Sequence, residues 1–274
     1  MGEYLKAIFF GILEGITEWL PVSSTGHMIL FDEFVHLNVS KDFKEVFLVL
    51  IQLGAILAVI IMFWNKIFPF KFNEGKNNII QKDIFSMWFK VVAAVIPSAV
   101  IGILFDEFFE EKFYNYQTVS IALIVFGIFF LVIENWNKKK TPTVNSIAEI
   151  TYKTAMIIGL FQVIAAVFPG VSRSGATIVG ALLIGVSRTV AAEFTFFLAI
   201  PTMFGASLLK IMKLGFEFSA QECVILMLGL LSAFVVSLLS IRFLMNYVKK
   251  HDFKVFGWYR IALGCLVLAY FICF

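Results

Sequence analysis

The residues with the clearest chemical potential lie in two apolar segments that proline and glycine interrupt. In the first segment, Glu14 and Glu18 are four residues apart, which places both carboxylates on one face of a helix. Hydroxyl and imidazole side chains follow directly, at Ser23, Ser24, Thr25 and His27. Two stacked carboxylates repel each other unless a cation or a shared proton neutralises them, and oxygen ligands suit Mg²⁺ or Ca²⁺. The pair predicts a divalent-cation site; two structural carboxylates bonded to hydroxyls are the alternative.

The second segment, residues 169–177 (PGVSRSGAT), offers the opposite charge. Its small residues allow backbone N–H groups to approach a ligand, and a helix that starts near Ala176 would point its positive end at the same place. Arg173 adds a planar guanidinium that matches phosphate oxygens, and neighbouring hydroxyls add donors. We therefore expect an anion site. The alternative is that Arg173 only pairs with Glu14 or Glu18 and holds the two segments together.

Together the two segments contain the groups that phosphoanhydride hydrolysis requires. Charge develops on the oxygens of a transferring phosphoryl group, so a metal ion and an arginine should provide most of the stabilisation. Ser24 is a candidate nucleophile, activated by His27 or Glu18. Attack by a metal-activated water, with Ser24 only positioning the phosphate, is equally compatible with the sequence. His27 has a simpler alternative role as a helix-capping hydrogen-bond partner.

The elements that position these residues are membrane-spanning helices. Of the 274 residues, 60% are hydrophobic and 15% charged, whereas globular domains average roughly 45–50% and about 25%. Spanning a bilayer takes about 20 apolar residues, and stretches apolar on all sides do not suit a soluble fold. Six stretches approach this length: 46–63, 89–105, 119–133, 194–209, 224–244 and 255–274. The sequence predicts an all-α integral membrane protein with six full transmembrane helices.

An internal repeat divides the chain almost in half. Gly11 aligns with Gly159, Glu14 with Gln162, and Pro21 with Pro169, and residues 23–26 then align with 172–175. Each half therefore contains one broken segment and three spans. If each broken segment enters and leaves on one side as a re-entrant helical hairpin, the second half is inverted relative to the first, and the two hairpins meet near the midplane. The alternative is that both broken segments simply span, with a kink at proline.

This interpretation divides the chain into two repeats within one membrane domain. The first repeat covers residues 1–136, with a re-entrant hairpin at about 4–36. A cytoplasmic linker follows at 137–150. The second repeat covers 151–274, with a hairpin at about 152–187.

Loop charges predict the orientation. Three loops are basic. The first contains Lys66, Lys71, Lys76 and Lys82, the second contains Lys138, Lys139, Lys140 and Lys153, and the third contains Lys249, Lys250 and Lys254. One loop is acidic, through Asp106, Glu107, Glu110 and Glu111. Six spans place the three basic loops on one side and the acidic loop on the other. Since basic loops are cytoplasmic, both termini should lie outside.

At these residues the sequence resembles a known family. Residues 14–27 (EGITEWLPVSSTGH) and 169–177 (PGVSRSGAT) look like the two signature motifs of the undecaprenyl-diphosphate phosphatase family, the bacitracin-resistance proteins. The similarity covers nearly the whole chain and includes 51–59 (IQLGAILAV) and 185–196 (GVSRTVAAEFTF). Two long motifs in the right order are far more specific than one short pattern.

The resemblance implies a multi-pass enzyme of the bacterial plasma membrane that acts on the extracytoplasmic side. It would remove the terminal phosphate of a C55 prenyl diphosphate, regenerate the lipid carrier of cell-wall synthesis and require a divalent cation. By position, Glu14 and Glu18 correspond to the acidic pair, Ser24 to the nucleophile, His27 to the acid/base residue and Arg173 to the phosphate-binding arginine. The other small and hydroxyl residues of the two motifs are expected to bind substrate: Ser23, Thr25, Gly26, Gly170, Ser172, Ser174, Gly175 and Thr177.

The main competing class is a transporter or flippase of anionic prenyl lipid, because inverted repeats with broken helices are common in transporters. A transporter needs no nucleophile beside its anion site, so Ser24 favours an enzyme. The membrane and the prenyl lipid are the expected partners, and no nucleic-acid partner is expected. The sequence leaves both a monomer and a homodimer open.

Overall fold

The computed structural model describes residues 2–71, 80–215 and 217–273, and within this part of the chain it contains helices and no strand. Lys76 of the first basic loop lies outside the described residues. The helices are α1 (Glu3–Thr17), α2 (Ser24–Asp32), α3 (Lys41–Met62), α4 (Trp64–Ile67), α5 (Lys82–Phe113), α6 (Tyr116–Asn137), the short 3₁₀ turn η1 (Ile147–Glu149), α7 (Tyr152–Val167), α8 (Arg173–Leu183), α9 (Arg188–Leu214), α10 (Ala220–Tyr247) and α11 (Lys254–Cys273).

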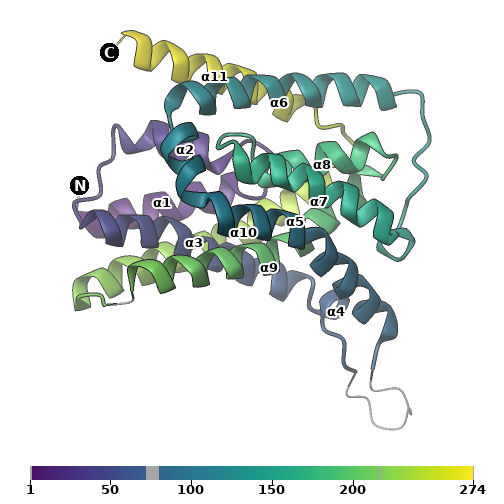
Figure 1. The fold of residues 1–274 in the computed structure, drawn as a ribbon, viewed down its shortest axis with the longest axis horizontal. Helices are drawn as coiled ribbons and strands as arrows, with labels where there is room; N and C mark the ends of the chain where they lie inside the picture. Colours follow the sequence, from purple (N-terminus) through teal and green to yellow (C-terminus); the bar gives the residue numbers. More distant parts are fainter. Residues whose placement is uncertain (1, 72–79, 216, 274) are drawn as a thin grey trace.

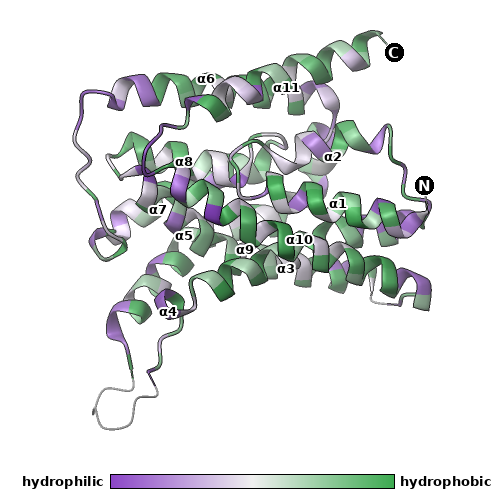
Figure 2. Ribbon diagram, turned by 180° about the vertical axis from the view of Figure 1, so that it is seen from behind, coloured by the Kyte–Doolittle hydropathy of each residue, from purple (hydrophilic) through white to green (hydrophobic). Residues whose placement is uncertain are grey.

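Six of these helices are long and apolar enough to cross a membrane: α3, α5, α6, α9, α10 and α11. Each covers all, or all but the last residue, of one of the six stretches predicted from the sequence. Their outward faces carry many exposed apolar side chains, among them Ile103, Met227 and Leu239, as a lipid-facing surface requires. Figure 2 shows the same division, with green along the long helices and purple concentrated in the loops and at the helix ends.

Four shorter helices form two consecutive pairs. α1 and α2 contain 15 and 9 residues, and α7 and α8 contain 16 and 11. At a rise of 1.5 Å per residue, none of the four reaches the roughly 30 Å of a bilayer core. Each pair is separated by a break in the helix, at residues 18–23 and 168–172. These connections are called the first and second break below.

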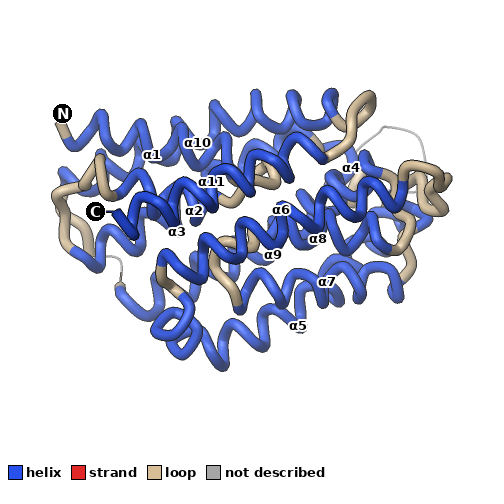
Figure 3. The backbone as a smooth tube through the Cα atoms, turned by 90° about the horizontal axis from the view of Figure 1, so that it is seen from above, coloured by secondary structure: helices blue, strands red, loops and turns tan. Residues whose placement is uncertain are grey.

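Helix packing interleaves the two halves of the chain. α1 of the first half lies along α10 of the second, and α7 of the second half lies along α5 of the first. α6 pairs with α11, and together they cover one side of the molecule above α2 and α8 (Figures 1 and 3). Glycine permits the α6–α11 contact, since a Cβ added at Gly127 would lie 2.7 Å from the carbonyl oxygen of Gly257.

The two ends of the bundle differ in what they carry. Both chain termini lie at one end, and the 138–151 linker and α4 lie at the other (Figure 1). The breaks lie between these ends. Trp19 in the first break is fully buried, and its ring packs edge-on against Phe196 of α9 at 5.2 Å, which fixes this break against a long helix.

Candidate active site

The first break owes its shape to Ser23. Its φ of 73° lies in the left-handed region, which is uncommon for a residue with a side chain. The Ser23 hydroxyl accepts a hydrogen bond from the backbone N–H of Gly26 at 3.3 Å and so caps α2. The result is a sharp turn that brings the end of α1 and the start of α2 to one place.

The second break has the same local conformation. Ser172 has a φ of 69°, and its hydroxyl accepts from the N–H of Gly175 at 3.1 Å to cap α8. Gly170 has a φ of +90°, and a Cβ at this position would lie 2.6 Å from the carbonyl oxygen of Val119. A glycine is therefore required here by both its backbone and its neighbour.

Glu18 joins the two breaks. One carboxylate oxygen accepts from Arg173 Nη2 at 3.0 Å, and the other accepts from the Ser24 hydroxyl at 2.9 Å. The backbone carbonyl of Glu18 accepts from the Ser174 hydroxyl at 3.1 Å. Carboxylate, guanidinium and hydroxyl therefore meet at one point, built from both halves of the chain.

Arg173 is held in place from α9. Its Nη1 donates to the carbonyl oxygen of Thr195 at 3.0 Å. Thr177 donates to the carbonyl oxygen of Arg173 at 2.9 Å, and its hydroxyl lies 2.8 Å from that of Thr195. The Arg173 Nε–H is buried without a hydrogen-bond partner among the described residues. A buried charged donor without a partner is costly, so this N–H is a natural contact for a bound anion.

Glu14 lies one helical turn before Glu18 and is almost completely buried. Its Oε1 has no hydrogen-bond partner in the described part of the chain. This part of the chain also contains no cluster of three His, Cys, Asp or Glu side chains that could hold a metal ion. A buried carboxylate oxygen without a hydrogen-bond partner has the chemistry of a ligand for a hard cation, and cations such as Mg²⁺ complete their shells with water and substrate phosphates. The predicted ligand pair Glu14 and Glu18 is compatible with this chemistry, with Glu14 supplying the unengaged oxygen.

The imidazole of His27 has two partners. Its Nδ1 lies 2.7 Å from the carbonyl oxygen of Ser23, and its Nε2 lies 2.6 Å from the hydroxyl of Tyr259 in α11. A carbonyl can only accept, so Nδ1 carries the proton. In the neutral ring Nε2 is then the acceptor, and Tyr259 is the donor. Because Ser24 donates to Glu18, the hydrogen-bonded base for the Ser24 hydroxyl in this structure is Glu18.

Comparison with known proteins identifies the family. Residues 7–266 match the family described as "Bacitracin resistance protein BacA". The chain belongs to this family. It is 65% identical over 270 residues to "Undecaprenyl-diphosphatase 1" of Clostridium acetobutylicum, covering 98% of each chain. It is 62% identical to the "Undecaprenyl-diphosphatase" of Desulfitobacterium hafniense, covering 98% of this chain and 96% of the relative. It is 61% identical to an "Undecaprenyl-diphosphatase" of Enterococcus faecalis, covering 97% and 96%.

One residue that the sequence analysis missed contacts both breaks of the candidate site. Arg260 of α11 is fully buried, and its Nη2 donates to the carbonyl oxygens of Gly170 at 2.9 Å and Val171 at 2.7 Å. Its Nη1 lies 3.4 Å from the carbonyl oxygen of Pro21. Arg260 therefore ties the first break to the second. A single arginine inside the otherwise apolar stretch 255–274 was the available signal, since charges at membrane depth mark functional positions.

The remaining predicted residues line the same turns of this BacA family site. Thr25 is half-buried in the first turn of α2. Gly26 is buried, and a Cβ there would lie 3.0 Å from Leu123. A Cβ at Gly175 would lie 2.8 Å from Arg260 Nη1, so α8 begins in close contact with α11. Apart from Glu14, which lies in α1, all predicted site residues belong to the two breaks or to the first five residues of the helices that follow them.

Proposed function

We propose that this protein hydrolyses undecaprenyl diphosphate to undecaprenyl phosphate and inorganic phosphate. The observation that carries the proposal is the junction of Glu18, Arg173 and Ser24, which places a base, an anion-binding group and a nucleophile within hydrogen-bonding distance. The relatives that match over nearly the whole chain bear the name undecaprenyl-diphosphatase. Membership of the family described as a bacitracin resistance protein accords with the same activity.

The chemistry begins with the terminal phosphate bound by Arg173, whose free Nε–H faces no protein acceptor among the described residues. Ser24 attacks the terminal phosphorus while its proton moves to Glu18, a bond from serine oxygen to phosphorus forms, and the bond to the bridging oxygen breaks. Undecaprenyl phosphate leaves, and water then cleaves the phosphoserine to release inorganic phosphate. Direct attack by water, with Glu18 as the base and Ser24 as a phosphate ligand, uses the same groups.

A divalent cation held by Glu14 and Glu18 would neutralise phosphate oxygens and so stabilise the charge that develops during transfer. The protein's own contribution is positional. Glu18 keeps Arg173 and Ser24 at fixed places, and Tyr259 holds His27 at the edge of the first break. From there His27 is proposed to move a proton to or from the reacting phosphate.

An apolar groove next to the second break supports a lipid substrate. This groove has a volume of about 350 Å³ and lies between α5, α6 and α7, and Val171 of the second break is one of its lining residues. The other lining residues are mainly aromatic and aliphatic, including Phe113, Phe126 and Phe168. We propose that the first isoprene units of the chain occupy this groove, since burying apolar surface contributes about 25 cal/mol per Å².

We also propose the finer architecture expected from the sequence, namely an inverted-topology repeat with two re-entrant hairpins. The interleaved packing supports it, because α1 on α10 and α7 on α5 are equivalent contacts under the repeat. The left-handed caps Ser23 and Ser172 are equivalent as well. In this arrangement the basic loops are cytoplasmic, both termini are outside, and the site opens to the extracytoplasmic side.

The test is phosphate release from a long-chain prenyl diphosphate by purified protein in detergent, with Mg²⁺, with Ca²⁺ and with a chelator. Arg173→Ala and Glu18→Gln should each lower kcat/KM at least about 100-fold, the scale of a lost electrostatic contact to the transition state. Arg242→Ala on the exposed face of α10 is the matched control and should retain activity. No release by folded wild-type protein under any condition would refute the proposal, and lipid movement without phosphate release would instead establish a transporter.

The two chemical routes separate in a further experiment. Ser24→Ala should abolish release by the serine route, and a phosphorylated Ser24 should be trapped by rapid acid quenching of the wild-type protein. Residual activity of Ser24→Ala within about tenfold of wild type, with no phosphoserine, would establish direct attack by water.

A further inference from the structure

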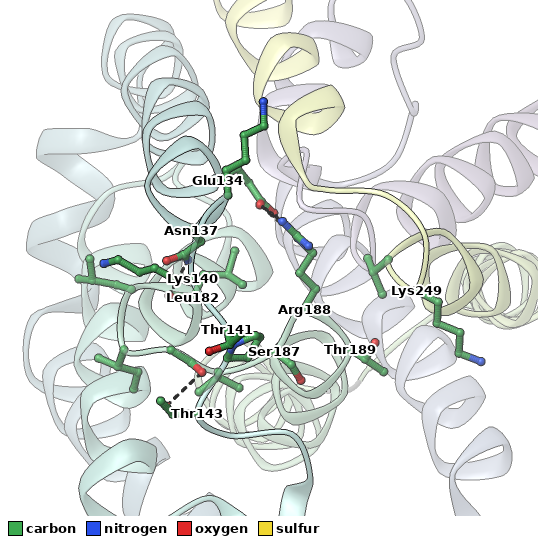
Figure 4. Close-up of a pocket in the computed structure, with 17 residues that line it drawn as sticks. Glu134, Asn137, Lys140, Thr141, Thr143, Leu182, Ser187, Arg188, Thr189 and Lys249 are labelled. Atoms are coloured by element: carbon green, nitrogen blue, oxygen red, sulfur yellow. Dashed lines mark hydrogen bonds and ion pairs between the residues drawn. The ribbon is translucent and has the colours of Figure 1, made fainter.

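A second cavity, distinct from the apolar groove and lined mainly by polar residues, lies at the end of the bundle that carries the linker. Its volume is about 610 Å³, and its walls are the end of α6, the linker from Lys138 to Thr143, the turn between α8 and α9, and the end of α10. Figure 4 shows residues of all these segments around the cavity. The catalytic groups lie elsewhere, since Arg173 begins α8 whereas Leu182, in its last turn, lines this cavity. Arg173 and Leu182 are nine positions apart in α8, which separates the two places by about 14 Å along the helix.

Hydrogen bonds fix the walls of this cavity. The backbone N–H of Thr143 donates to the carbonyl oxygen of Gly185 at 2.8 Å, and that of Ser187 donates to Val144 at 2.9 Å. The side-chain amide of Asn137 donates to the carbonyl oxygen of Leu182 at 2.8 Å. The linker is therefore hydrogen-bonded to the α8–α9 turn, and these bonds define the shape of the cavity.

The lining of this cavity is strongly cationic. Lys138, Lys140, Lys249 and Arg188 line it, and Glu134 is the only acidic residue among its lining groups. The Glu134 side chain has no exposed surface, and its carboxylate is already bonded to Arg188. Within the described residues, none of the three lysines forms an ion pair. The three lysine charges around the cavity are therefore not neutralised by a neighbouring carboxylate, and the side chains of Lys140 and Lys249 extend outward from its rim (Figure 4).

The start of α9 adds to this positive potential. Ser187, its N-cap, makes no side-chain capping bond, and Ser187, Arg188 and Thr189 all line the cavity. The free N–H groups of a first helical turn carry about half an elementary charge and favour an anion. The N-terminus of α9 and the lysines thus both favour the binding of an anion.

Aromatic and apolar neighbours place this cavity at the level of lipid headgroups. Trp136 in the last turn of α6 is 61% exposed, and the Lys140 ammonium lies 3.9 Å from the centre of its ring. Leu183, which lines the cavity, is 52% exposed. Exposed tryptophan marks the interface between bilayer and water, and lysine beside it reaches the headgroup region. The cavity is therefore open to an anion that is carried by a lipid.

We infer that this cavity binds the headgroup phosphate of an anionic phospholipid. Basic pockets between transmembrane helices recognise such headgroups, and each lysine near an anionic membrane surface is worth about 1 kcal/mol. Free inorganic phosphate shares the same chemistry but lacks the acyl chains that the exposed Leu183 and Trp136 would contact. The inference is independent of the proposed hydrolysis, since none of the cavity residues belongs to the two breaks.

The test is equilibrium binding of fluorescent phosphatidylglycerol to the whole purified protein in a neutral detergent. The key variant carries Lys138→Gln, Lys140→Gln and Lys249→Gln. The matched control carries Lys139→Gln, Lys153→Gln and Lys250→Gln, which removes the same charge from the same end of the molecule at residues that do not line the cavity. Loss of three lysine contacts should weaken binding at least about tenfold in the key variant, and the control should bind within about threefold of wild type.

Two further measurements separate the sources of the anion. Phosphatidylcholine, which has no net charge, should bind the wild type at least about tenfold more weakly than phosphatidylglycerol. Inorganic phosphate at millimolar concentration should not displace the labelled lipid. Equal weakening in both triple variants would overturn the site, because it would show a diffuse charge effect. Displacement by inorganic phosphate would overturn the lipid headgroup as its ligand. Thermal unfolding of both variants within a few degrees of wild type excludes misfolding as the cause.

Discussion

Replacing Arg260 by methionine is expected to damage catalysis far more than stability. The change removes the short hydrogen bonds to Gly170 and Val171, at 2.9 and 2.7 Å, and the longer contact to Pro21 at 3.4 Å. Leaving the two strongly bonded carbonyls without donors costs about 1–3 kcal/mol each. Removing a buried guanidinium that has no carboxylate partner relieves several kcal/mol of desolvation and offsets most of this loss. We therefore expect a net loss of about 1–3 kcal/mol in the free energy of unfolding.

Catalysis has no such offset, because the two breaks are then free to shift relative to each other. A displacement of about 1 Å between nucleophile and phosphate site costs roughly 100-fold in rate, or about 2.7 kcal/mol. Phosphate release by Arg260→Met should fall by this factor, and Arg260→Lys, which keeps the charge but reaches fewer carbonyls, should be intermediate. Arg242→Met on the exposed face of α10 is the control. Full activity in Arg260→Met would refute the view that Arg260 aligns the breaks.

Three smaller changes probe neighbouring contacts. Tyr259→Phe removes the 2.6 Å hydrogen bond to His27 and should lower kcat about five- to tenfold with little change in melting temperature, because Tyr259 is 47% exposed; unchanged kcat would exclude a positioning role. Gly175→Ala places a Cβ 2.8 Å from a guanidinium nitrogen at the start of α8 and should lower phosphate release at least about tenfold, whereas wild-type activity would show that the contact relaxes freely. Arg188→Ala leaves the buried Glu134 with one backbone donor, the N–H of Phe253. It should lower the free energy of unfolding by about 1–3 kcal/mol, measured by thermal or denaturant unfolding. This loss is smaller than that for a fully buried ion pair, because the Arg188 side chain is 37% exposed. A melting temperature equal to that of wild type would contradict this.

The sequence predicted the parts of the fold that depend on local composition. Six apolar stretches became six long helices, because bilayer-length apolar segments have few other stable structures. The alignment of residues 23–26 with 172–175 placed Ser23 opposite Ser172, and these two residues are the non-glycine residues with positive φ in the described chain. The sequence analysis also expected Glu18 and Arg173 to lie close together, either in one shared site or as an ion pair that holds the two segments together.

Long-range contacts to α11 were not predictable in the same way. Tyr259 and Arg260 lie in an apolar stretch with no motif. Their partners, His27 in α2 and Pro21 in the first break, are 232 and 239 residues away. The sequence offered either His27 or Glu18 as the base for Ser24. In the fold the Ser24 hydroxyl is bonded to Glu18, and Nε2 of His27 is bonded to Tyr259. The lysines of the linker were similarly assigned to membrane orientation alone. Their second property, a shared cavity with the end of α10, depends on how the linker folds back onto the α8–α9 turn.

The interleaved packing has a consequence for the order of synthesis. α1 lies along α10, and His27 bonds to a residue that is made 232 positions later. At 5–20 residues per second the ribosome needs roughly 10–50 s to supply α11 after the first break has emerged. Until Arg173 and the later helices have been made, Glu14 and Glu18 lack the groups that enclose them, so the nascent segment needs water or the insertion machinery beside it. The first part of the site to be made is thus the last to be completed.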